Sequence, residues 1–136
     1  MISILAVDDN PINRKIYLAI LKKTAQCDIA VNGSEALRIY RDAVSSGKKY
    51  DAMLLDVVMP EVDGIQVLKT IREEEKSRQV SPEDRLFIVM VTSEKQELGH
   101  AYDLGCDDFM VKPVDADKLI EKILAKNNFR KIRPKK

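Results

Sequence analysis

Short apolar runs alternate with amphipathic segments along the whole chain. The apolar runs are rich in β-branched residues, and we predict strands at residues 2–7, 27–31, 50–56, 86–92 and 107–111. The segments between them repeat apolar residues at helical spacing, and we predict helices at residues 11–23, 34–47, 65–78, 94–105 and 115–127. Strands that alternate with helices in this way indicate right-handed crossovers and a parallel sheet covered on both faces.

Capping residues refine the starts of these helices. Asn10 is the expected N-cap of the first helix, with Pro11 at its first position, and Ser34 and Asp115 are the expected caps of the second and last helices. The apolar stripe of the first helix is expected to consist of Ile12, Ile16, Leu18, Ala19, Ile20 and Leu21.

Length and charge limit the classes of function. The 136 residues suit one domain, and the formal net charge of +1 gives no general argument for nucleic acid or for an anionic membrane. No apolar run approaches the roughly 20 residues that a membrane span needs. Cys27 and Cys106 lack the CxxC spacing of a metal or redox motif; two reduced thiols are the favoured interpretation, and one disulfide is the alternative.

Polar side chains gather where the predicted strands end. Asp8 and Asp9 follow the first strand, Asp56 ends the third, Thr92 ends the fourth and Lys112 follows the fifth. In open parallel sheets, ligands bind beyond the carboxyl ends of the strands. Taken alone, an acid or a threonine at such a place is usually a helix cap and a lysine a surface residue, so the functional argument depends on all five occurring together.

This combination favours magnesium and phosphoryl chemistry. Three neighbouring carboxylates repel one another, and a divalent cation removes the conflict. A few carboxylate oxygens suit Mg²⁺ better than zinc. Lys112 and Thr92, opposite the acids, supply the charge and the hydroxyl that an incoming phosphoryl oxygen needs. Asp56 is therefore a candidate nucleophile that becomes an aspartyl phosphate.

The same residues carry a family resemblance. The motifs VDDN (7–10), LLDVVMPEVDG (54–64), VT (91–92) and VKP (111–113) resemble those of response-regulator receiver domains of two-component signalling. The resemblance covers residues 1–127, and residues 128–136 are expected to be a basic tail or the start of a linker. It implies an α/β, flavodoxin-like, doubly wound fold with a five-stranded parallel sheet in the order 2-1-3-4-5 and five helices.

The resemblance also implies roles for single residues. Asp56 is expected to be the phosphoacceptor, Asp9 a direct Mg²⁺ ligand, and Asp8 a ligand through a water. Val58 would offer its backbone carbonyl to the metal, and Lys112 would pair with the phosphoryl group.

A conformational switch is implied as well. Thr92 would hydrogen-bond a phosphoryl oxygen, and Phe109 would then rotate inward and change the surface formed by the fourth helix, fifth strand and fifth helix. Without the resemblance, Phe109 is an ordinary half-buried aromatic residue. Pro113 would follow a cis peptide bond, and Gly64 would open the third helix where a side chain would crowd the turn.

The implied function is that of a phosphorylated switch rather than an enzyme with a separate substrate. The donor would be a histidine kinase or a histidine phosphotransfer protein, and the output a protein contact by a monomer or a phosphorylation-linked dimer. We expect no nucleic-acid or membrane partner for this domain, and a cytoplasmic location. VDDNPINR (7–14) resembles receivers attached to hybrid histidine kinases, so the chain is a candidate fragment of a longer protein.

Two features depart from the family pattern. The segment 72–85 is long, which indicates an extended third helix and a solvated loop, or a partner-contact loop; the stretch 92–105 is short. The basic residues 129–136 indicate a linker, a solvated tail or a weak contact with anions.

Two other functions compete. A haloacid-dehalogenase-type phosphohydrolase also uses an aspartate at a strand end, Mg²⁺ and a lysine, but it needs a second acid where this chain has Val58. A flavodoxin-like cofactor binder would need a Ser/Thr/Gly-rich phosphate loop where this chain has Asp8 and Asp9.

Overall fold

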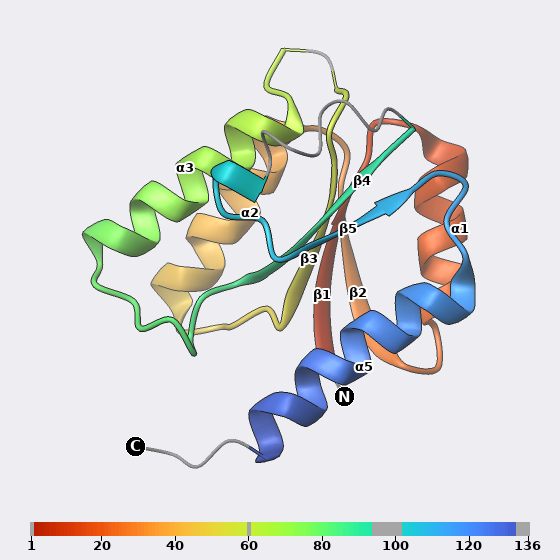
Figure 1. Ribbon diagram of the computed structural model, residues 1–136. Coiled ribbons are helices and arrows are strands. Elements are labelled where there is room, and N and C mark those ends of the chain that lie inside the picture. Colours follow the sequence, from red (N-terminus) through yellow and green to blue (C-terminus); the bar gives the residue numbers. More distant parts are fainter. Residues whose placement is uncertain (1, 60, 94–101, 133–136) are drawn as a thin grey trace.

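A five-stranded parallel sheet forms the centre of the molecule in a computed structural model that describes residues 2–59, 61–93 and 102–132 (Figure 1). The strands are β1 (Ile2–Val7), β2 (Ala25–Ala30), β3 (Ala52–Asp56), β4 (Phe87–Thr92) and β5 (Asp108–Val111). The helices are α1 (Pro11–Leu21), α2 (Gly33–Ser46), α3 (Gly64–Ser77) and α5 (Ala116–Ile132). The strand order is β2-β1-β3-β4-β5, as predicted.

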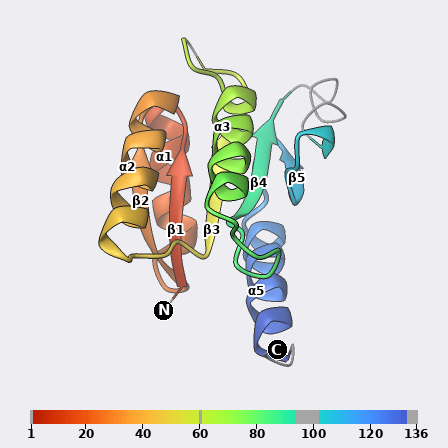
Figure 2. The same cartoon turned by 90° about the vertical axis from the view of Figure 1, so that its left-hand side faces the viewer.

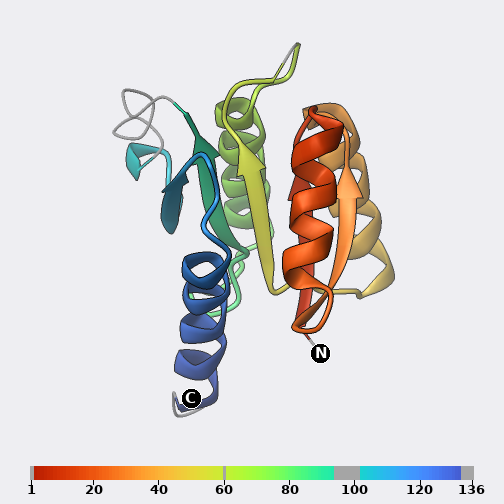
Figure 3. The same cartoon turned by 90° about the vertical axis from the view of Figure 1, so that its right-hand side faces the viewer.

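Helices cover both faces of the sheet. Figure 2 shows α2 and α3 in front of one face, and Figure 3 shows α1 and α5 in front of the other. Alternate residues of the central strands feed two separate cores, because successive side chains of a strand point to opposite faces. In β3, Met53 and Leu55 belong to the core under α2 and α3, and Leu54 belongs to the core under α1 and α5. All five residues of β3 are buried, as expected for a central parallel strand.

Strand pairing brings the carboxyl ends to one edge of the sheet. Val7 of β1 lies opposite Leu55 of β3, and Asp56 lies opposite Val91 of β4. Thr92 in turn lies opposite Val111 of β5. The residues that follow these positions therefore emerge at the same edge.

Two strands, β2 and β3, start two residues away from their predicted starts, and β4 and β5 each start one residue later than predicted. β2 begins at Ala25 rather than at residue 27, because Ala25 pairs with Ile2 at the start of β1. β3 begins at Ala52 rather than at residue 50; the preceding Asp51 still bonds to Ser3 through its backbone N–H and its carboxylate, at 2.8 Å each.

Two of the three predicted helix caps are confirmed. Asn10 caps α1 by accepting the Ile12 N–H at 2.8 Å, and Asp115 accepts the Lys118 N–H at 3.0 Å at the start of α5. α3 begins at Gly64 with a capping box between Asp63 and Gln66. The predicted cap of α2 was wrong: Asn32, not Ser34, accepts the Glu35 N–H at 2.8 Å.

The expected apolar stripe of α1 was correct only at its end, where Leu21 is buried and Ile20 packs half-buried against the core. The helix buries Tyr17 and Leu21, whereas Ile12, Ile16 and Leu18 are exposed. Apolar residues occur on every side of this helix, so their spacing did not decide which side faces the sheet.

Four of the five predicted helices lie within the described residues. The helix predicted at 94–105 falls mostly on residues 94–101, outside that part of the chain, and residues 102–103 are helical. The backbone of α5 remains helical to Ile132, past the expected domain end at residue 127. The described part of the chain has no helix that is both long and apolar enough to cross a membrane.

Candidate functional site

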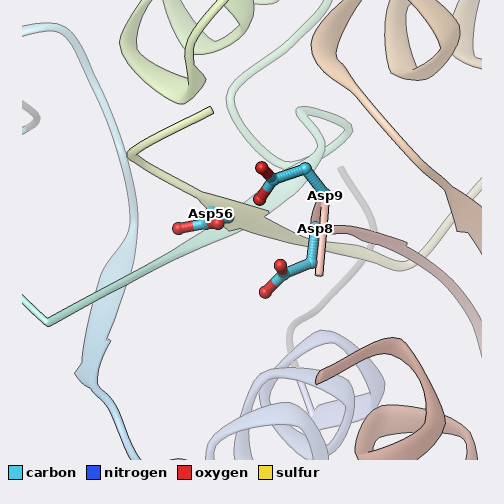
Figure 4. Close-up of side chains that lie close together, drawn as sticks. All are labelled: Asp8, Asp9 and Asp56. Atoms are coloured by element: carbon cyan, nitrogen blue, oxygen red, sulfur yellow. The ribbon is translucent and has the colours of Figure 1, made fainter. Parts of the chain in front are cut away.

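Two buried carboxylates lie side by side at the carboxyl edge of the sheet. Asp8 follows β1 and is fully buried, and Asp56, the last residue of β3, is 4% exposed. The exposed Asp9 joins them: one carboxylate oxygen from each of the three acids lies within 4.8 Å of the others (Figure 4). The predicted acid cluster is therefore present.

A lysine that follows the edge strand β5 reaches both buried acids. The Nζ of Lys112 lies 3.2 Å from Oδ2 of Asp8 and 3.3 Å from Oδ2 of Asp56. The backbone sets this position, because the Lys112 N–H donates to the Thr92 carbonyl at 2.9 Å and continues the pairing of β5 with β4. A cis peptide bond to Pro113 follows the lysine.

Backbone donors hold the carboxylates in place. Oδ1 of Asp8 accepts the Asn10 N–H at 2.9 Å, and Oδ1 of Asp56 accepts the Val58 N–H at 3.3 Å. The guanidinium of Arg14 donates to the Asp8 carbonyl at 2.9 Å and ties α1 to this loop. Oδ2 of Asp8 makes no hydrogen bond with any described protein atom, although it is buried and faces the lysine ammonium.

The electrostatics of the site favour proton uptake by Asp56. Burial raises the pKa of Asp56 from 3.8 to about 6, and repulsion by Asp8 adds to the rise. The charge of Lys112 and the Val58 N–H oppose the rise without cancelling it. Burial, followed by the charges of Asp8 and Asp56, also raises the pKa of Tyr17, so this residue stays a neutral phenol beneath the acids.

These residues fit a hard divalent cation. Three carboxylates offer oxygen ligands within 4.8 Å of one another, and the buried Oδ2 of Asp8 faces the Lys112 ammonium at 3.2 Å without forming a hydrogen bond. Oxygen ligands of this kind suit Mg²⁺ or Ca²⁺ rather than softer metals. One ammonium group among the three acids leaves negative charge for a cation to offset.

Thr92 and Val58 adjoin this centre, and Phe109 lies on β5, three residues before Lys112. Thr92 ends β4, is 1% exposed and follows the residue that pairs with Asp56. Val58 is 57% exposed beside the acids. Phe109 is half-buried in β5, and its ring meets that of Tyr102 edge to face at a centroid distance of 5.7 Å.

Gly64 allows the start of α3 to pack closely against the backbone of Asp56. A Cβ at this position would overlap the backbone carbonyl oxygen of Asp56, and the Gly64 N–H donates to the Val57 carbonyl at 2.9 Å. The predicted crowding is therefore real: α3 begins so close to the end of β3 that only glycine fits.

Three supporting residues were not predicted as part of the site: Arg14, Tyr17 and the Asn10 N–H as a donor to Asp8. The capping role of Asn10 was a usable signal, because a residue that starts α1 directly after Asp9 must lie close to the acids. Tyr17 was hidden by the wrong choice of the buried side of α1.

Comparisons with known proteins agree with this geometry. Residues 4–124 match the family described as the response regulator receiver domain. Hybrid signal transduction histidine kinase L of Dictyostelium discoideum is 37% identical over 122 residues, which are 87% of this chain and 7% of that protein. Two-component response regulator 24 of Arabidopsis thaliana is 33% identical over 126 residues, 92% of this chain and 83% of that protein. The chain thus spans a small part of the hybrid kinase and most of the plant regulator.

Two solved structures share the fold and more than a quarter of the sequence. The complex of the Saccharomyces cerevisiae phosphotransfer protein Ypd1 with the receiver domain of Ssk1 matches with a TM-score of 0.81 and 29% identity, over 95% of this chain and 90% of the matched chain. Response regulator TrrA of Thermotoga maritima, solved with Mg²⁺ and BeF, matches with a TM-score of 0.75 and 28% identity, over 93% of this chain and 99% of the other. On these grounds, the chain belongs to the response regulator receiver domain family of two-component and phosphorelay signalling.

Proposed function

We propose that this receiver domain accepts a phosphoryl group on Asp56 from the phosphohistidine of a histidine kinase or a histidine phosphotransfer protein. One observation carries the proposal: Lys112 Nζ lies within 3.3 Å of both buried carboxylates, at the edge where three acids meet. An ammonium group there can neutralise a phosphoryl oxygen that arrives beside Asp56.

The proposed reaction is an in-line displacement at phosphorus. A carboxylate oxygen of Asp56 forms the new O–P bond while the P–N bond to the imidazole breaks, and its electron pair returns to the ring nitrogen. Lys112 offsets the charge of the phosphoryl oxygens, and the Thr92 hydroxyl donates a hydrogen bond to one of them. Water later hydrolyses the acyl phosphate, and the exposed Val58 side chain limits the access of that water.

Mg²⁺ is part of the proposal. Asp9, Asp56 and the backbone carbonyl of Val58 would hold the ion directly, and Asp8 would act through a water. When bound, the ion supplies positive charge that offsets the carboxylates and the phosphoryl oxygens.

We propose two protein contacts on different surfaces. The phosphodonor contacts α1, because Ile12 is 67% exposed, Ile16 is 42% exposed one turn later, and α1 begins beside the acids. The downstream partner contacts the surface formed by β5, α5 and the helix predicted at 94–105, which lies mostly outside the described residues, and Phe109 would move there after phosphorylation. The proposal includes a cytoplasmic location, where Cys27 and Cys106, unpaired in the structure, stay reduced.

The phosphohydrolase alternative has no supporting observation. The side chain two residues after Asp56 is the apolar Val58, which provides no second acid, and the matched family consists of receiver domains. Stoichiometric self-phosphorylation, rather than turnover of many substrate molecules, is therefore the expected behaviour.

Incubation with acetyl phosphate and Mg²⁺, followed by intact mass measurement, tests the proposal. We expect one hydroxylamine-labile phosphoryl group on the wild type, none on Asp56→Asn, and a normal adduct on the control Asp117→Asn, whose side chain is exposed on α5. An adduct on Asp56→Asn, or continuous hydrolysis of phosphomonoesters by the wild type, would reject it.

The donor surface has its own test. Ile12→Ser should slow transfer from a histidine phosphotransfer protein at least about tenfold, since buried interface anchors carry most of the binding energy. It should leave the reaction with acetyl phosphate unchanged. Leu124→Ser, at a 38% exposed apolar position on α5, is the matched control. Equal slowing by both variants would remove α1 as the docking site.

A further inference from the structure

A cavity of about 230 Å³ opens between α2 and α3 at the amino ends of β3 and β4. It lies at the other end of the sheet from the acid cluster and takes no part in the phosphoryl-transfer proposal. Figure 2 shows the two helices running side by side over this face. Part of its wall comes from the long segment 72–85, whose role the sequence left open between a solvated loop and a contact surface.

The interior of the cavity is mainly apolar and aromatic. Tyr40 and Ala43 of α2 are 5% and 6% exposed, and Tyr50 and Leu86, which precede β3 and β4, are 6% and 5% exposed. Two tyrosine rings and aliphatic side chains provide a surface that fits a flat or short apolar group. The volume is smaller than the roughly 300 Å³ at which sites for drug-sized ligands begin, so the ligand is small.

Most of the charged side chains at the cavity are already neutralised. Their pairs are Glu75 with Arg72 at 2.6 Å, Lys49 with Asp84 at 3.1 Å, and Lys48 with Asp28 at 3.0 Å. The second oxygen of the buried Glu75 accepts the Leu86 N–H at 2.7 Å, so this acid is fully engaged. Arg78 differs from these side chains: it forms no ion pair with any residue that the structure describes, and it leaves one positive charge uncompensated at the cavity.

The exposed Arg78 is positioned by the hydroxyl group of the buried Tyr40. Its Nη2 donates to the Tyr40 hydroxyl oxygen at 2.7 Å, and its guanidinium carbon lies 5.6 Å from the centre of the Tyr40 ring. Because the hydroxyl oxygen accepts this bond, its own proton is left to donate to a ligand. Burial raises the pKa of Tyr40, which keeps that proton in place. A guanidinium and a phenol thus present donors side by side at the wall of an apolar cavity.

We propose that this cavity binds a small monocarboxylate whose apolar body is about the size of an aromatic ring. The body lies against Tyr50 and Leu86, and the carboxylate accepts hydrogen bonds from Arg78 and the Tyr40 hydroxyl. Charge-assisted hydrogen bonds from arginine match carboxylate geometry, and the aromatic walls contribute apolar contact area. A bound ligand would bridge α2 and α3, and the amino-terminal end of α3 supports Asp56 through Gly64.

Nuclear magnetic resonance titration of the ¹⁵N-labelled chain tests this site. Benzoate is the probe, acetate lacks the apolar body, and benzyl alcohol lacks the charge. We expect benzoate to shift the backbone signals of residues around the cavity, with a dissociation constant of about 1 mM, which corresponds to about 4 kcal/mol. Acetate and benzyl alcohol should each bind at least about five times more weakly, since each lacks one of the two interactions.

Substitutions separate the two donors from the fold. Arg78→Gln and Tyr40→Phe should each weaken benzoate binding about five- to tenfold, the loss expected for a charge-assisted hydrogen bond. Lys76→Gln, at an exposed position on α3 that does not line the cavity, should not alter binding. The absence of shifts around the cavity in the wild type would overturn the proposal. So would equal binding of benzyl alcohol or acetate, or unchanged binding by both donor variants.

Discussion

Removing the charge of Asp56 should stabilise the metal-free protein at neutral pH. The carboxyl group is 4% exposed, and its pKa rises from 3.8 to about 6, chiefly through burial and then through repulsion by Asp8. A group whose pKa is raised by folding stabilises the protein below its unfolded pKa, and this contribution is lost as the pH rises through the folded pKa. The wild type should therefore lose stability between about pH 4 and pH 7.

The magnitude follows from the size of the shift. At about 1.4 kcal/mol per pKa unit, the rise from 3.8 to about 6 corresponds to about 3 kcal/mol. Asn is uncharged at every pH and has nearly the shape of a protonated carboxyl group. As the pH rises from about 5 to about 8, the unfolding free energy of Asp56→Asn should increase by about 1.4 kcal/mol relative to that of the wild type. This is roughly half of the total of about 3 kcal/mol, because the other half is lost below about pH 5.

Urea unfolding followed by circular dichroism, with a chelator present, measures this difference. Comparing the two proteins at each pH cancels the titration of all other groups that the substitution leaves unchanged. Asp117→Asn, at an exposed position, is the control and should change the unfolding free energy by less than about 1 kcal/mol, with no trend in pH. A difference between Asp56→Asn and the wild type that stays constant, or that grows toward acid pH, would refute the assigned burial and repulsion.

The other predictions concern the supports of the site. Gly64→Ala should lower the unfolding free energy by about 2–4 kcal/mol in the same assay, because the new Cβ overlaps the Asp56 carbonyl oxygen. Gly47→Ala, where a Cβ meets no atom but φ is +78°, should cost only about 1 kcal/mol; equal losses would contradict the overlap. Lys112→Met should raise the pKa of Asp56 further, measured by ¹³C carboxyl titration, and slow phosphorylation by acetyl phosphate at least about 100-fold. An unchanged rate would show that the ammonium group is not needed.

The fold was predictable because the sheet leaves a simple pattern. β3 and β4 are buried on both sides, so they appear as continuous apolar runs that end abruptly at Asp56 and Thr92. The ends of parallel strands share one edge, and this rule alone placed Asp8, Asp56 and Lys112 together.

Which side of α1 faces the sheet was not predictable by the same means. Seven of its residues are apolar, and they surround the helix, so helical spacing is compatible with more than one buried side. The structure buries Tyr17, whose ring fills the core below the acids, and leaves Ile12 and Ile16 exposed. Contact with the sheet, rather than the hydrophobicity of single residues, decided the orientation.

Buried charge was the second feature that the sequence concealed. In the run Arg72-Glu73-Glu74-Glu75, only Glu75 is buried, where it meets Arg72 at 2.6 Å and the Leu86 N–H at 2.7 Å. Nothing in three consecutive glutamates distinguishes the buried one. The distinction depends on the path of residues 78–86, which bring a backbone donor back to α3 and also form part of the cavity wall.

Calorimetric titration of Mg²⁺ tests most directly whether the acids at the edge of the sheet share one cation. The titration compares the wild type with Asp9→Asn and Asp56→Asn, at a pH above the pKa of Asp56, where that carboxylate is ionised. We predict one bound ion per wild-type chain and at least about tenfold weaker binding in each variant, since each loses a charged ligand. Absence of binding to the wild type, or equal affinity in all three proteins, would contradict a shared metal site.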